Sequence, residues 1–105
     1  MIYEVHIGEQ VFDAIRRAVR YIVVDCDSPV NAERWLGNLW DRIDELELMP
    51  RRFGVDEVYT SQVGCATHKL VFGAYLVYYQ VDDGRGRVNV VDFVHGATRA
   101  DVEGR

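Results

Sequence analysis

The sequence lacks the segments that would direct a chain into or across a membrane. No apolar run approaches the ~20 residues that a membrane-spanning helix needs. The N-terminus has no basic stretch followed by an apolar segment, so we expect no signal peptide and a cytoplasmic protein. The chain has 105 residues and 49% hydrophobic content, which predicts one globular domain over residues 1–105.

Cysteine is scarce, with Cys26 and Cys65 the only two in the chain. They form no C-x-x-C motif, and together with His6, His68 and His95 they show no zinc-binding spacing. Two cysteines in a cytoplasmic protein are expected to be reduced thiols. We therefore predict no disulfide, no metal site and no cofactor.

Basic residues are too few to favour strong binding to nucleic acid. The formal net charge is −5; residues 1–62 contain seven basic and twelve acidic residues, and residues 63–105 contain five of each. Phosphate contacts from a basic surface provide most of the affinity for RNA or DNA. The composition therefore weakens the hypothesis of nucleic-acid binding, although an acidic chain can still have a local basic patch.

The C-terminal half is rich in β-branched and aromatic residues, which are typical of strands. Gly73 suits a tight turn, and Asp82–Gly86 is a longer polar turn. We predict an antiparallel set of strands at Gln62–Phe72 (strongest from Leu70), Tyr75–Val81 and Val88–His95.

The N-terminal half begins with a short alternating segment, Met1–Ile7, which predicts a strand. A helical period follows from Glu9, and a second helix is expected from Pro29 to about Met49, with Ser28 as its N-cap and Pro50 ending it. Arg51–Ser61 is predicted to be a polar loop. The predicted fold is α+β, in the order β-α-α-β-β-β, with a helical hairpin packed on one face of a mainly antiparallel four-stranded sheet.

Each predicted helix has one apolar stripe, which consists of Val11, Ala14, Ile15, Ala18 and Ile22 in the first helix and of Ala32, Trp35, Leu36, Leu39, Ile43 and Leu46 in the second. Other apolar residues lie beside these stripes. Phe12, Val19 and Val23 broaden the apolar face of the first helix, so they form either core or a groove for a partner. Trp40 flanks the stripe of the second helix and is either a lid on the core or an aromatic anchor for a partner.

Several motifs resemble a known family. They are Leu46-x-x-x-Pro50-x-x-x-Gly54 at the end of the second helix, Gly73-x-Tyr75-x-Val77-x-Tyr79-x-Val81-Asp82, the strand Val88–Val94, and the ending His95-Gly96-Ala97-Thr98-Arg99. The last of these resembles a His-Gly-Ala-Arg ending in which Thr98 intervenes before the arginine. In order and spacing the motifs resemble the RelE/ParE superfamily of toxins from bacterial type II toxin–antitoxin systems, over nearly the whole chain.

The resemblance implies one of two activities, both neutralised by a cognate antitoxin that wraps the toxin. RelE-like members cleave mRNA on the ribosome without a metal, using basic side chains on the sheet and, in several members, a tyrosine near the C-terminus as general base. ParE-like members bind and poison DNA gyrase and need no such set of residues. Homodimers and toxin–antitoxin heterotetramers both occur in the superfamily.

Only part of the catalytic residue set of the RelE-like nucleases is present in this chain. The arginine that often follows the central-strand tyrosine is Leu76 here, and Glu103 stands where the C-terminal tyrosine is often found. Lys69 and Arg99 remain as basic candidates, and His95 is either a general base or a structural histidine at a strand end. A rearranged nuclease site would require Lys69, His95 and Arg99 to converge on one surface.

The favoured hypothesis is therefore a ParE-like toxin that acts by protein–protein binding, with DNA gyrase as the implied target. The alternatives are a RelE-like mRNA endonuclease and a degenerate, non-toxic member. We expect the antitoxin to contribute a helix beside the helical hairpin and a strand at a sheet edge. The predicted partner-binding residues are Phe12, Val19, Trp40, Leu76 and Arg99.

Overall fold

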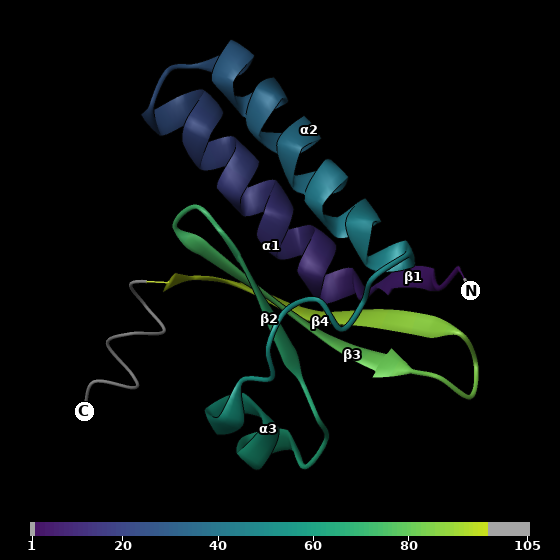
Figure 1. Ribbon diagram of the computed structural model, residues 1–105. Coiled ribbons are helices and arrows are strands. Elements are labelled where there is room, and N and C mark those ends of the chain that lie inside the picture. Colours follow the sequence, from purple (N-terminus) through teal and green to yellow (C-terminus); the bar gives the residue numbers. More distant parts are fainter. Residues whose placement is uncertain (1, 97–105) are drawn as a thin grey trace.

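The computed structural model describes residues 2–96, and its elements follow the predicted order with one addition (Figure 1). The strands are β1 (Glu4–Ile7), β2 (His68–Phe72), β3 (Tyr75–Asp82) and β4 (Arg87–His95). The helices are α1 (Glu9–Arg20), α2 (Pro29–Asp44) and the added α3 (Glu57–Val63). A π-helical turn (Tyr21–Asp25) extends α1, and a 3-10 turn (Glu45–Glu47) follows α2.

The four strands form one mixed sheet in the order β1-β4-β3-β2. β1 runs parallel to β4, and the other neighbouring strands are antiparallel. Gly73 has a φ of +57°, a left-handed conformation that favours glycine, in the tight turn between β2 and β3. The predicted α+β fold, with a mainly antiparallel four-stranded sheet, is therefore confirmed.

The helical hairpin covers one face of this sheet, and α3 lies on the other face (Figure 1). The core between hairpin and sheet contains buried residues from both helices, the 3-10 turn after α2 and three strands: Val11, Ile15, Ala18, Leu39, Ile43, Leu46, Leu70, Val77, Tyr79, Val88, Val90 and Phe93. Trp35 of α2 extends this core, because its ring contacts Phe72, Tyr75 and Phe93 edge-on. The predicted apolar stripes thus face the sheet.

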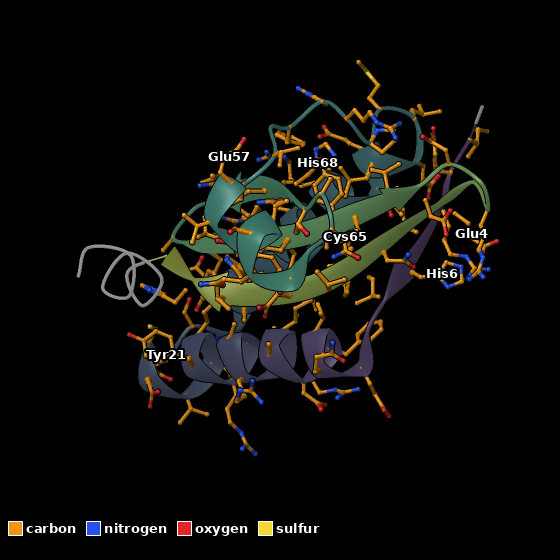
Figure 2. All side chains as sticks on the ribbon, turned by 90° about the horizontal axis from the view of Figure 1, so that it is seen from below. Glu4, His6, Tyr21, Glu57, Cys65 and His68 are labelled. Atoms are coloured by element: carbon orange, nitrogen blue, oxygen red, sulfur yellow. The ribbon has the colours of Figure 1, made fainter. Side chains whose placement is uncertain are left out.

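The region predicted as a polar loop contains the helix α3, so that part of the prediction was wrong. Asp56 caps α3 by accepting a hydrogen bond from the backbone N–H of Tyr59 at 2.8 Å. Gly64, with a φ of +75°, ends the helix in a left-handed conformation. The second strand consequently begins at His68 rather than at the predicted Gln62. Figure 2, seen from the α3 side, shows this helix in front of the strands.

A polar cluster connects the residue before β1 and the loop after α2 to the turn between β3 and β4. The Tyr3 hydroxyl donates to Asp83 Oδ1 at 2.7 Å, and the Arg51 guanidinium donates to both Asp83 carboxylate oxygens, at 3.1 and 2.5 Å. These hydrogen bonds, that of Arg51 above all, hold the pKa of Asp83 below its ordinary value. The loop after α2 is thereby fastened to the sheet.

Candidate functional site

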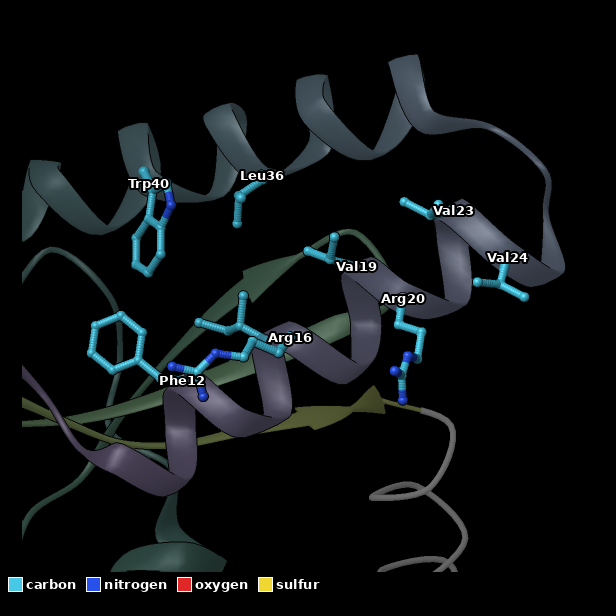
Figure 3. A pocket seen from close by; sticks show the side chains of 9 residues that line it. Phe12, Arg16, Val19, Arg20, Val23, Val24, Leu36 and Trp40 are labelled. Atoms are coloured by element: carbon cyan, nitrogen blue, oxygen red, sulfur yellow. The ribbon is translucent and has the colours of Figure 1, made fainter.

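An open apolar groove of about 430 Å³ lies between α1 and α2. Figure 3 shows Phe12, Val19 and Val23 pointing from α1 and its π-helical extension towards Leu36 and Trp40 of α2. Ile15 and Val24 complete its apolar lining, and the remaining two lining residues are Arg16 and Arg20. The groove thus offers a largely apolar surface to solvent.

Helical spacing explains why these residues form a groove rather than core. Val11, Ile15 and Ala18 turn towards the sheet and are buried, whereas Phe12 and Val19 lie along the neighbouring edge of the same helix. Leu36 and Trp40 are one helical turn apart in sequence, so they form one edge of α2. The two edges face each other and bury each other only in part.

Phe12 and Trp40 close one end of the groove. Their ring centroids are 5.9 Å apart, and Phe12 remains 37% exposed. Trp40 and Val19 are half-buried and pack against the core cluster. Trp40 therefore covers part of the core and also presents an aromatic face to the groove.

Leu76 lies on the opposite face of the sheet from this groove. It pairs with Val71 on one side and Val94 on the other, so the three side chains form an apolar row across β2, β3 and β4. Val71 is 52% exposed, and Leu76 and Val94 are half-buried. The predicted partner contacts in the described residues therefore divide between two surfaces.

Lys69 and His95, two of the candidate catalytic residues, lie on opposite faces of the sheet. Successive side chains of a strand point to opposite faces of the sheet. Because the neighbouring Leu70 is buried in the core under the helical hairpin, Lys69 points away from the hairpin. His95 shares the face of Phe93, towards the hairpin, and contacts the Tyr75 ring edge-on. The convergence that a rearranged nuclease site requires is not found for this pair, and Arg99 lies outside the described residues.

Lys69 has a local partner on its face of the sheet. Its Nζ lies 3.4 Å from Oδ2 of Asp56, the N-cap of α3. In the same region the Tyr59 ring stacks on Tyr78 with centroids 4.2 Å apart, and its hydroxyl donates to Asp92 at 3.2 Å. These contacts fasten α3 to the face of the sheet that carries Lys69.

The buried aromatic residues beside this region have structural roles. His68 is buried, stacks on Tyr79 and has its Nδ1 2.7 Å from the Phe53 carbonyl oxygen. The Tyr79 hydroxyl donates to the Pro50 carbonyl oxygen at 2.6 Å. Burial raises the pKa of Tyr79 to about 12, so the side chain is protonated at neutral pH. Tyr78 is also fully buried.

Metal-ligating side chains do not gather within residues 2–96: no three histidine, cysteine, aspartate or glutamate side chains lie there in a way that could hold a metal ion. In the same range no helix has the length and apolar character needed to span a membrane. Cys26 and Cys65 are both free and exposed.

A helical hairpin on one face of a mainly antiparallel four-stranded sheet is the arrangement expected for the RelE/ParE superfamily of type II toxins. The family model for the ParE toxin of the type II toxin–antitoxin system parDE matches residues 5–100. The chain therefore belongs to the ParE toxin family and is a type II toxin, which implies a cognate antitoxin as its partner. A comparison with curated proteins gives no significant match.

Proposed function

We propose that this toxin acts by binding DNA gyrase in the cytoplasm and that its antitoxin neutralises it by covering the apolar groove. The observation that supports this proposal best is the groove itself. Phe12, Val19 and Trp40 line it together although they come from two helices. A large apolar surface open to solvent is typical of a protein–protein binding site.

The antitoxin is proposed to contribute a helix to the groove and a strand to the sheet edge. β2 is an outer strand, and its Lys69 N–H already donates to the Gly54 carbonyl oxygen at 3.0 Å. Because backbone groups alternate along a strand, those of Val71 point outwards in the same direction. An added strand would pair there, beside the apolar row of Val71, Leu76 and Val94.

Several observations weigh against mRNA cleavage. The position of a frequent catalytic arginine is Leu76, and Lys69 is held by Asp56 beneath α3. Loss of a group that stabilises transition-state charge commonly lowers a rate by roughly 10²–10³-fold, which corresponds to about 3–4 kcal/mol. A nuclease built from Lys69 and His95 would also need groups from two faces of the sheet.

Expression of the chain alone in a bacterial host tests the proposal. Growth, the DNA-damage response and bulk mRNA integrity should be followed together. We expect growth arrest with DNA-damage signalling and intact mRNA, and we expect co-expression of the cognate antitoxin to restore growth. Arrest with fragmented mRNA would instead favour a nuclease. Normal growth with folded protein would indicate a non-toxic member or a target that the host lacks.

A further inference from the structure

The groove between α1 and α2 carries charge on its rims, although its floor is apolar. Of the described residues that line it, only Arg16 and Arg20 are charged, and they lie one turn apart on α1. Figure 3 shows both extending from the α1 side of the groove. Arg16 pairs with Asp13 at 2.5 Å, whereas no ion pair of Arg20 is found within residues 2–96. The α1 rim is therefore basic.

The α2 rim has a different chemistry. Glu33 precedes Leu36 by three residues and Trp40 by seven, so helical spacing places it along the same edge of α2. Gly37 lies one turn after Glu33, and a Cβ added there would have no atom within 4 Å apart from its chain neighbours and the backbone of its own helix. The α2 rim thus combines an exposed acid with open space, which would let a second backbone approach closely.

The dimensions of the groove suit a short helix. It extends along α1 and its π-helical extension from Phe12 to Val24, which corresponds to about 18 Å at the α-helical rise of about 1.5 Å per residue, or about three helical turns. A helix of three to four turns with one apolar stripe would cover this length. The stripe would lie over the floor, and each flank would face one rim.

We propose that the groove selects an amphipathic helix whose α1-facing flank is acidic, so that its carboxylates meet Arg16 and Arg20. This inference rests on the proposed function, because it takes the antitoxin as the source of the helix. The net charge of −5 disfavours an acidic partner at long range. Screening limits the range of interactions between exposed charges to about 8 Å at physiological salt. The basic rim beside the groove therefore determines which charge on the helix flank is preferred.

Synthetic peptides test this preference. Three fluorescent 14-residue helical peptides share one leucine stripe and differ only on one flank, which carries glutamate, glutamine or lysine. Binding to the full chain is measured by anisotropy at about 50 and 300 mM salt. We expect the glutamate peptide to bind at least about tenfold more tightly than the lysine peptide at the lower salt concentration, and the difference to shrink at the higher one.

Two protein variants test whether Arg16 and Arg20 cause the charge preference. Arg16→Glu with Arg20→Glu should reverse the preference, and Arg16→Gln with Arg20→Gln should abolish it. Arg17→Glu with Arg34→Glu is the control for the charge reversal, because it changes the net charge equally at exposed residues outside the groove lining. Circular dichroism verifies that all three variants fold.

The outcomes separate this inference from the proposed function. Equal affinities for all three peptides, with binding that is lost in Trp40→Ala, would overturn the charge preference and leave the groove as a docking site. Reversal by the control pair would also overturn it, since net charge alone would then explain the effect. If no peptide binds, both the charge preference and the groove's role in docking a helix fail.

Discussion

Asp56 and Lys69 form an ion pair between α3 and β2, with 3.4 Å between Oδ2 and Nζ. The Asp56 side chain is 6% exposed, and that of Lys69 is 38% exposed. The same Asp56 carboxylate caps α3. The pair therefore gives Lys69 a structural role, which is independent of any contact with RNA.

Lys69→Met should destabilise the fold without changing the interaction with the target. The methionine keeps an apolar stem of similar length but removes the cation beside a nearly buried carboxylate. We expect the free energy of unfolding to fall by about 1–2 kcal/mol, measured by urea denaturation. Antitoxin affinity and toxicity per folded molecule should stay unchanged. Unaltered stability together with lost toxicity would show that Lys69 acts on the target.

Gly37→Ala should stabilise the protein. Gly37 lies in the middle of α2, is exposed and has room for a Cβ. An alanine there should raise the free energy of unfolding by about 0.5–1 kcal/mol. Gly64→Ala is the contrasting variant, because a φ of +75° strains an alanine and should lower stability by about 1 kcal/mol or more. Equal effects of the two substitutions would refute this interpretation.

Tyr79 should make stability depend on pH in the alkaline range. Its pKa is raised from 10.0 to about 12 by burial, so the unfolded chain loses this proton first. The contribution is fully present below the unfolded pKa of 10.0 and is lost as the pH rises through the folded value of about 12. It corresponds to about 2–3 kcal/mol.

Denaturation of the wild type and Tyr79→Phe across the alkaline range, from about pH 9 to 12, measures this contribution. The variant should be about 1–2 kcal/mol less stable at the start of that range, because the Pro50 carbonyl oxygen loses its donor. Its stability should then fall less steeply with pH. Parallel curves for the two proteins would show that Tyr79 does not titrate differently in the folded state.

Phe12→Ala should weaken antitoxin binding more than it weakens the fold. Phe12 is partly exposed and touches Trp40 at the end of the groove. We expect at least about a tenfold loss of antitoxin affinity, as for an aromatic anchor residue of an interface. The stability loss should be about 1–2 kcal/mol. Calorimetric titration with purified antitoxin measures the affinity.

Val30→Ala is the control for Phe12→Ala. Val30 is 68% exposed near the start of α2 and is not part of the groove lining. Its substitution should leave antitoxin affinity within about twofold of the wild type, since isolated exposed apolar residues contribute little. Similar losses from Val30→Ala and Phe12→Ala would place the antitoxin elsewhere on the hairpin.

The apolar periodicity of the sequence was sufficient to predict both long helices and the face that each buries. Val11, Ile15 and Ala18, with Leu39 and Ile43, all lie in the core as their spacing requires. Phe12, Val19 and Trp40 could be identified as groove candidates because they lie beside these stripes. Leu36 was assigned to the core stripe, and only the packing of the two helices shows that it also lines the groove.

Other features depend on contacts between distant residues. The helix α3 has only seven residues, too few for a clear apolar period, and its remaining signals were Asp56 as N-cap and Gly64 at its end. Leu76 is a predicted partner contact like Phe12 and Trp40, but strand alternation places it on the other face of the sheet, away from the groove. The sequence gives no reason to single out Arg16 and Arg20, because a surface arginine in a helix is ordinary until its neighbours are known.

A supercoiling assay with purified DNA gyrase tests the central claim most directly. The toxin alone, and the toxin mixed with excess antitoxin, should be added to gyrase with relaxed plasmid and ATP, and the DNA topology and broken DNA should be quantified. We predict that the toxin alone inhibits supercoiling or accumulates broken DNA, and that the antitoxin abolishes this effect. Unchanged gyrase activity at a large molar excess of folded toxin would contradict the proposed target.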